Sequence, residues 1–239
     1  MATKVLNFYG YNVQKETVVM LMFEPPNTSQ LYQDQFPVVW KTLKFKPNRR
    51  AHAKSSVTYT DRLAFGYMET QESNLIEPSA WIDVQFGDVA VISGGLDSQC
   101  FGEVTHRTNN DHIICKNRSS VRVDLSLGLV RGEGVNERFE PVHFWDNVGY
   151  VVAIPVTPSP FVKPFSLYRK GSNVTANSFT PILTAYVTND HKGAEYLRGE
   201  ANADAIWSQN LDELDDITEW NFVEDPESGV YSITEATSD

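Results

Sequence analysis

Both cysteines of the chain and two of its five histidines fall within one short segment, between Cys100 and Cys115. His106 and His112 lie between the two cysteines. Thiolates and imidazoles are common zinc ligands, and a pair of thiols can also form a disulfide bond. A metal site, a disulfide loop and a plain β-hairpin are therefore the three interpretations of this segment.

The dipeptide Asn109–Asn110 predicts a two-residue hairpin turn, because asparagine tolerates the positive φ angles that such turns need. With this turn, Val104 faces Cys115 and Cys100 faces Ser119 across the hairpin. The two cysteines are then four residues out of register, roughly 13 Å apart at about 3.4 Å per residue. A disulfide needs Cα atoms within about 7 Å, so we predict that both cysteines are free.

A shared metal ion is harder to exclude for this hairpin. Alternation of side chains along the strands places Cys100, His106 and Cys115 on one face and His112 on the other. An ion held by His106 and His143, with Cys115 nearby, is one expectation. No C-x-x-C or H-E-x-x-H spacing supports it, however, and a buried free cysteine is commonly a core residue. The metal site and the plain hairpin both stay open at this point.

His143 and Trp145 suggest a ligand site, because they lie on the same face of one predicted strand. A flat apolar ring beside a hydrogen-bonding group is typical of a small-molecule pocket. We expect the pocket to form where these two residues and Tyr150 close over the hairpin face that carries His106 and Cys115. The alternative is that this face is ordinary core. The chain contains no G-x-S-x-G, P-loop or G-x-G-x-x-G motif, so we expect a binding protein and not an enzyme.

The elements that would position these residues are mostly strands. Stretches rich in valine, threonine and aromatic residues alternate with turn-forming clusters, which predicts an antiparallel β-sandwich. The predicted strands are Lys4–Asn12, Thr17–Phe23, Phe36–Phe45, Ser55–Gly66, Ala80–Phe86, Asp88–Ser93, Val121–Val130, Val142–Trp145, Tyr150–Val156, Pro181–Thr188 and Gly229–Thr234. Apolar residues spaced three and four apart predict one short amphipathic helix over Asn202–Leu214.

The domain organisation has two interpretations. A single domain over residues 1–239 fits the length of the chain. Val18 and Phe36 are separated by the same number of residues as Val121 and Phe139. The segments that contain each pair have similar strand-forming sequences. This echo allows two related β units, at 1–99 and 100–239.

Composition limits the partners and the compartment. The formal net charge of −11 repels phosphate backbones and anionic lipids, so we expect neither a nucleic acid nor a membrane partner. A homo-oligomer is compatible with the sequence. The N-terminus lacks a signal-peptide pattern, which favours a cytoplasmic protein. Three N-glycosylation tripeptides, at Asn27, Asn117 and Asn173, would then carry no sugar.

Several phrases distributed along the chain carry a resemblance to a known group of proteins. They are Val5-Leu-Asn-Phe-Tyr-Gly-Tyr11, Phe36-Pro-Val-Val-Trp-Lys41, Ser56-Val-Thr-Tyr-Thr60, Phe179-Thr-Pro-Ile-Leu-Thr-Ala-Tyr-Val187 and Gly229-Val-Tyr-Ser-Ile-Thr234. The chain resembles the small cytosolic proteins of mushroom fruiting bodies and, within that group, the pink chromoproteins of oyster mushrooms. The resemblance implies a pigment protein that holds a small organic chromophore. The alternative is a cytosolic lectin or defence-type protein that stacks exposed tryptophan or tyrosine rings on sugars.

Overall fold

The computed structural model describes residues 2–24, 35–47, 53–95, 98–107, 112–149, 173–177, 179–188, 191–199 and 204–236. Nearly all regular structure in these residues is β-strand, with single turns of 3-10 helix at Glu72–Asn74, Gly134–Asn136 and Leu211–Glu213. The strands pair mostly antiparallel, which confirms the predicted mainly β, antiparallel fold. Within the described ranges, no helix is long and apolar enough to cross a membrane.

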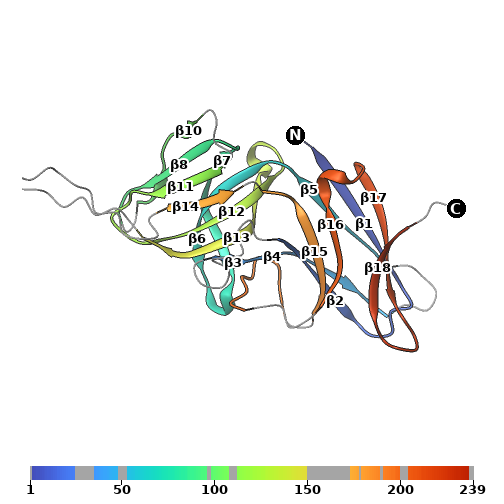
Figure 1. Ribbon diagram of the computed structural model, residues 1–239. Coiled ribbons are helices and arrows are strands. Elements are labelled where there is room, and N and C mark those ends of the chain that lie inside the picture. Colours follow the sequence, from blue (N-terminus) through green and yellow to red (C-terminus); the bar gives the residue numbers. More distant parts are fainter. Residues whose placement is uncertain are drawn as a thin grey trace, which may run out of the picture.

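The two ends of the chain build the first two sheets, which pack together as one sandwich (Figure 1). The first sheet has the order β18 (Tyr231–Glu235), β17 (Ile217–Glu224), β1 (Thr3–Tyr11) and β5 (Ala53–Thr60). The second has the order β16 (Ala205–Asn210), β15 (Ile182–Thr188), β2 (Thr17–Phe23) and β4 (Val39–Phe45). Aromatic rings join the two sheets: Phe45 stacks on Phe222 at 4.6 Å between centroids, and Phe8 meets Trp207 at 5.7 Å.

The middle of the chain builds two further sheets that share a buried apolar core and form a second sandwich (Figure 1). The third sheet has the order β3 (Phe36–Pro37), β13 (Arg138–Val148), β12 (Val123–Arg131), β6 (Leu63–Thr70) and β7 (Ile76–Val84). The fourth has the order β10 (Thr105–His106), β8 (Asp88–Ser93), β11 (His112–Asn117) and β14 (Asn173–Asn177), with β9 (Cys100–Phe101) paired to the end of β8.

The two sandwiches are joined by one continuous apolar core. Buried side chains from all four sheets belong to the same cluster, and β13 of the third sheet lies against β2 and β4 of the second. Each sheet, as far as it is described, contains strands from both sides of residue 99, for example β1 paired with β17 and β6 paired with β12. Whether the chain is one domain or two related units stays a prediction.

A second apolar cluster covers the outer face of the third sheet. Phe144 and Phe36 pack there against Tyr196, whose segment lies across the sheet. The Phe139 ring lies over Gly128, where an added Cβ would come within 2.5 Å of that ring. Strand β13 is therefore buried on both faces, which removes the alternation that makes a strand easy to delimit from sequence. The four residues predicted as the strand Val142–Trp145 are only part of it.

The helix predicted over Asn202–Leu214 is wrong for most of its length. Residues 205–210 form strand β16, which pairs with β15, and only Leu211–Glu213 forms a helical turn. The physical reason is that pairing with β15 places the Trp207 ring in the sandwich core, 5.0 Å from the Trp220 ring. Over so short a segment, apolar residues spaced three and four apart do not distinguish a helix from a strand that contains a bulge. Strand β16 has such a bulge opposite β15, next to Ala185.

The other strand predictions have mixed outcomes. Strand β17 (Ile217–Glu224) falls in a segment where no strand was predicted, and it pairs in parallel with β1. The predicted strand Tyr150–Val156 lies outside the described residues.

Candidate functional site

Residues 100–117 do not form the predicted hairpin, because β8 lies between β10 and β11. His106 on β10 pairs with Asp88 of β8, and Cys115 on β11 pairs with Ala90 on the other side of the same strand. The β8–β11 pairing is parallel, so no local turn signal could reveal it. The apolar strand β8 gains more burial at the centre of a sheet than the polar β10 would, which explains the insertion. The predicted turn at residues 108–111 lies outside the described residues.

The two cysteines are free, as predicted, but for a different geometric reason. Cys100 pairs with Ser93 on one side of β8, and Cys115 pairs with Ala90 on the other. Ser93 and Ala90 point to opposite faces of the strand, so the expectation that both cysteines share a face is wrong. Cys100 is exposed, whereas Cys115 is buried and its thiol pKa is raised by desolvation.

His106 lies at the edge of the fourth sheet and not against Cys115. Its Nδ1 is 2.8 Å from Oδ1 of the buried Asp88, whose Oδ2 accepts a hydrogen bond from the Gln85 backbone N–H. About half of the His106 side chain is exposed (49%), and His112 is exposed on β11, on the other side of β8. His106 is therefore bound to a carboxylate at the surface of the molecule.

The metal prediction gains no support from this arrangement. His106 belongs to the edge of the fourth sheet, and His143 is buried in the third. Within the described part of the chain, no group of three histidine, cysteine, aspartate or glutamate residues could hold a metal ion.

His143 is the most unusual of the predicted site residues. It lies on β13 between Leu127 of β12 and Pro37 of β3, beside a bulge, and its side chain is fully buried. Neither ring nitrogen has a hydrogen-bond partner among the described residues. Burial lowers the pKa of the imidazole from 6.5 to about 3, so the ring is neutral at pH 7 and offers one donor and one acceptor. Leaving such groups unpaired costs about 1–3 kcal/mol each.

A second unpartnered side chain lies on the same face of the third sheet. Gln35 is 2% exposed, and its Nε2 has no hydrogen-bond partner in the described structure. Phe36 pairs with Phe144, and continuing this antiparallel register by one residue places Gln35 opposite Trp145. Of the five buried polar atoms without a partner in the described residues, three belong to Gln35 and His143. The unsatisfied polar groups are therefore concentrated at one place.

Aromatic rings surround this place. Phe179 meets the His143 ring edge to face, with 6.1 Å between centroids, and Phe23 lies 5.5 Å from Phe179. Trp145 is buried beside them, on the face of β13 that also carries His143. We call Gln35, His143, Trp145, Phe179 and Phe23 the His143 cluster. It lies where the second and third sheets meet, and it combines apolar walls with three N–H donors and one acceptor that have no partner among the described residues.

The structure thus keeps some predicted site residues together and separates others. His143 and Trp145 share one face of β13 in the third sheet, whereas Cys115 is buried on β11 of the fourth. His106 lies apart, at the edge of the fourth sheet, and Tyr150 is outside the described residues. Sequence reasoning missed Gln35 and Phe179, because neither carries a motif and both reach the cluster through long-range pairing.

No protein-family model, curated protein or solved structure matches this chain. The geometry of the cluster is therefore the main basis for a functional hypothesis.

Proposed function

We propose that this protein is a non-enzymatic binding protein that holds a small planar organic ligand in the His143 cluster. The observation that carries the proposal is the buried, neutral imidazole of His143, whose two nitrogens have no partner among the described residues. Buried polar groups in folded proteins almost always have a hydrogen-bond partner, and exceptions call for an explanation. A molecule bound between the aromatic side chains would supply the missing hydrogen-bond partner.

The chemistry of the cluster selects a class of ligand. The imidazole offers one donor and one acceptor, and the amide of Gln35 offers further donors. A flat molecule with a carbonyl oxygen and a ring N–H or hydroxyl group would satisfy them, while its faces pack against Phe179 and Trp145. A neutral imidazole cannot compensate a charged group in this buried environment, so the ligand is uncharged where it meets His143.

The resemblance to coloured mushroom proteins makes the proposal more specific. It supports a conjugated ligand that absorbs visible light, and hence a cytoplasmic pigment protein. The sugar-binding alternative has less support, because it needs exposed tryptophan or tyrosine rings, and the described tyrosines are all buried or half-buried. Trp40, Trp145, Trp207 and Trp220 are all buried, and Trp81 is partly buried against Phe139.

The test begins with protein purified from its natural source. We expect a visible absorption band, and a small molecule detectable by mass spectrometry after denaturation, in about equimolar amount. Elemental analysis of the same sample addresses the metal alternative. A colourless protein that releases no small molecule would refute the proposal.

A matched pair of variants then locates the ligand. His143→Leu keeps the side-chain volume but removes both ring nitrogens, and we expect its ligand content to fall at least tenfold. His112→Leu makes the same change at an exposed position of β11 and should retain the ligand. Circular dichroism confirms that both variants are folded. Full ligand content in folded His143→Leu would place the ligand elsewhere.

A further inference from the structure

One end of the third sheet gathers positive charge in a chain that is acidic as a whole. Lys41 Nζ lies 2.7 Å from Glu140 Oε1, and Arg131 Nε lies 3.3 Å from the same oxygen. Oε2 of Glu140 accepts a hydrogen bond from the Trp40 indole at 2.8 Å. Both carboxylate oxygens are therefore in use, and Glu140 is only 10% exposed. One buried carboxylate thus anchors two cations.

A third cation stands directly beside this group. Arg138 pairs with Arg131 across β12 and β13, so both side chains leave the same face of the sheet. The Arg138 side chain is exposed and makes no hydrogen bond or ion pair with any described residue. Like charges that face each other across two strands repel, which makes this pair unfavourable unless an anion lies between them.

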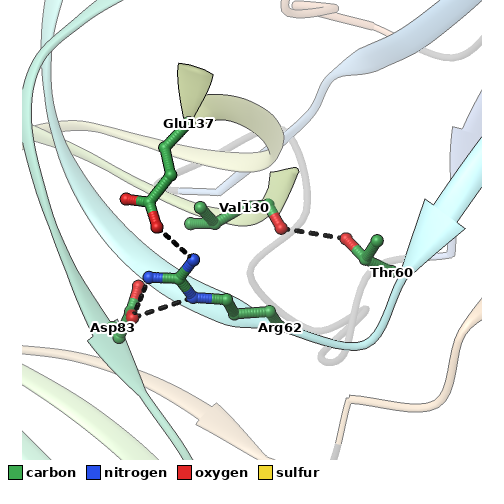
Figure 2. A network of polar contacts seen from close by, with 5 residues as sticks. All are labelled: Thr60, Arg62, Asp83, Val130 and Glu137. Carbon is green, nitrogen blue, oxygen red and sulfur yellow. Dashed lines mark hydrogen bonds and ion pairs between the residues drawn. The ribbon is translucent and has the colours of Figure 1, made fainter. Parts of the chain in front are cut away.

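The nearest carboxylate in sequence does not neutralise Arg138. Glu137, immediately before β13, accepts a hydrogen bond from Arg62 Nη1 at 2.5 Å. Figure 2 shows Arg62 held between Glu137 and Asp83, so that both carboxylates of this network are engaged. Lys41, Arg131 and Arg138 carry three positive charges against the single negative charge of Glu140. Among these four described residues the excess is two positive charges.

We propose that Arg131 and Arg138 form a binding site for a small oxyanion, a phosphate or carboxylate group, with Lys41 adding to the positive potential. Arg131 is oriented by its Nε contact with Glu140, and its two terminal nitrogens make no hydrogen bond to a described residue. Guanidinium groups bind such oxyanions through paired N–H donors. A doubly charged anion would cancel the local excess. Side-chain exposures of 41% for Arg131 and 27% for Lys41 leave the site open to solvent.

This site is separate from the His143 cluster. His143 is fully buried and takes an uncharged group, whereas the arginine pair is accessible and selects an anion. A negative result for one of the two proposals therefore does not contradict the other.

Inorganic phosphate is the first probe and acetate the second, each titrated into the full-length protein at pH 7 and low ionic strength. Arginine Nε–H signals in ¹H–¹⁵N NMR spectra report binding. We expect saturable shifts at Arg131 and Arg138, with affinity that falls as sodium chloride is added. Tighter binding of phosphate identifies a phosphate site, and equal or tighter binding of acetate identifies a carboxylate site. Shifts that do not saturate with either anion would overturn the proposal.

Variants test the assignment. Arg138→Gln removes an exposed side chain that has no partner among the described residues, so it should fold normally and weaken anion binding at least about tenfold. Arg131→Gln should weaken it similarly, and Arg122→Gln, at an exposed position before β12, is the matched control. Unchanged affinity in folded Arg138→Gln would also overturn the proposal.

Discussion

The Trp40 indole donates a hydrogen bond to Glu140 across the junction of the two sandwiches, joining β4 of the second sheet to β13 of the third. Trp40 also packs 5.1 Å from Phe23, which in turn contacts Phe179 beside His143. Glu140 therefore has two roles. It orients the cations of the proposed anion site, and it fixes one ring of the aromatic wall that encloses the His143 cluster.

Replacing Glu140 by glutamine should destabilise the protein. The variant keeps the shape of the side chain but leaves Lys41 and Arg131 without their shared anion. We expect the free energy of unfolding to fall by about 1–3 kcal/mol, measured by urea denaturation. Glu133→Gln, in the exposed turn between β12 and β13, is the control and should change it by less than about 0.5 kcal/mol. Equal stability of Glu140→Gln and the parent protein would show that this contact is not needed at the junction.

His143 should make the protein less stable in acid. The unfolded chain binds a proton at this residue below pH 6.5, whereas the folded chain does so only near pH 3. Between these values the unfolded state holds more protons, so stability falls as pH falls, by about 1.4 kcal/mol per unit. At pH 5 the loss from this residue is about 2 kcal/mol.

The measurement compares the parent protein with His143→Leu in urea at pH 7 and pH 5. Other groups titrate in the same range, but their contributions cancel in the difference between the two proteins. The parent should lose about 2 kcal/mol more than the variant between these pH values. The same pH dependence in both proteins would mean that the imidazole gains a proton, or a partner, in the folded state.

The two thiols should differ sharply in reactivity. Cys100 is exposed at the end of β9, and Cys115 is buried with a raised thiol pKa. Because the thiolate is the reactive form, a water-soluble disulfide reagent should modify only Cys100 in the folded protein. Cys115 should react after denaturation. Cys100→Ser should abolish the reaction of the native protein, and a second fast thiol would indicate that the fourth sheet opens readily.

The sequence predicted the strand-rich fold because apolar and β-branched residues recur between turn signals over most of the chain. It could not predict which strands are neighbours. The turn residues Asn109 and Asn110 suggested a local hairpin, but the apolar strand β8 occupies the position between β10 and β11. Likewise, β17 pairs with β1 from the opposite end of the chain. Such pairings depend on the burial available in the whole fold and leave no local pattern.

The candidate site shows the same limit of sequence-based prediction: contacts between residues of different strands could not be predicted. His143 and Trp145 could be proposed together because neighbours of the same strand face are visible in sequence. Gln35 lies 110 positions before Trp145 and reaches it only through the β3–β13 pairing. A hairpin would bring His106 close to Cys115, but β8 lies between the two strands that carry these residues. Proximity within one strand was predictable, and proximity between strands was not.

Gly128 offers a last test, because it controls the position of β13. An added Cβ would lie 2.5 Å from the Phe139 ring and 2.6 Å from the Glu140 backbone oxygen. The ring can turn, but the backbone oxygen belongs to the β12–β13 ladder, so Gly128→Ala must move β13 itself. We expect the free energy of unfolding, measured by urea denaturation, to fall by about 1–3 kcal/mol.

Because β13 also carries His143, the Gly128→Ala variant should retain less ligand when it is purified from a host that produces the ligand. Gly102→Ala, where the nearest atom lies at 3.7 Å, should change neither stability nor ligand content. Normal ligand retention in a destabilised Gly128→Ala protein would argue against a ligand site that depends on the position of β13.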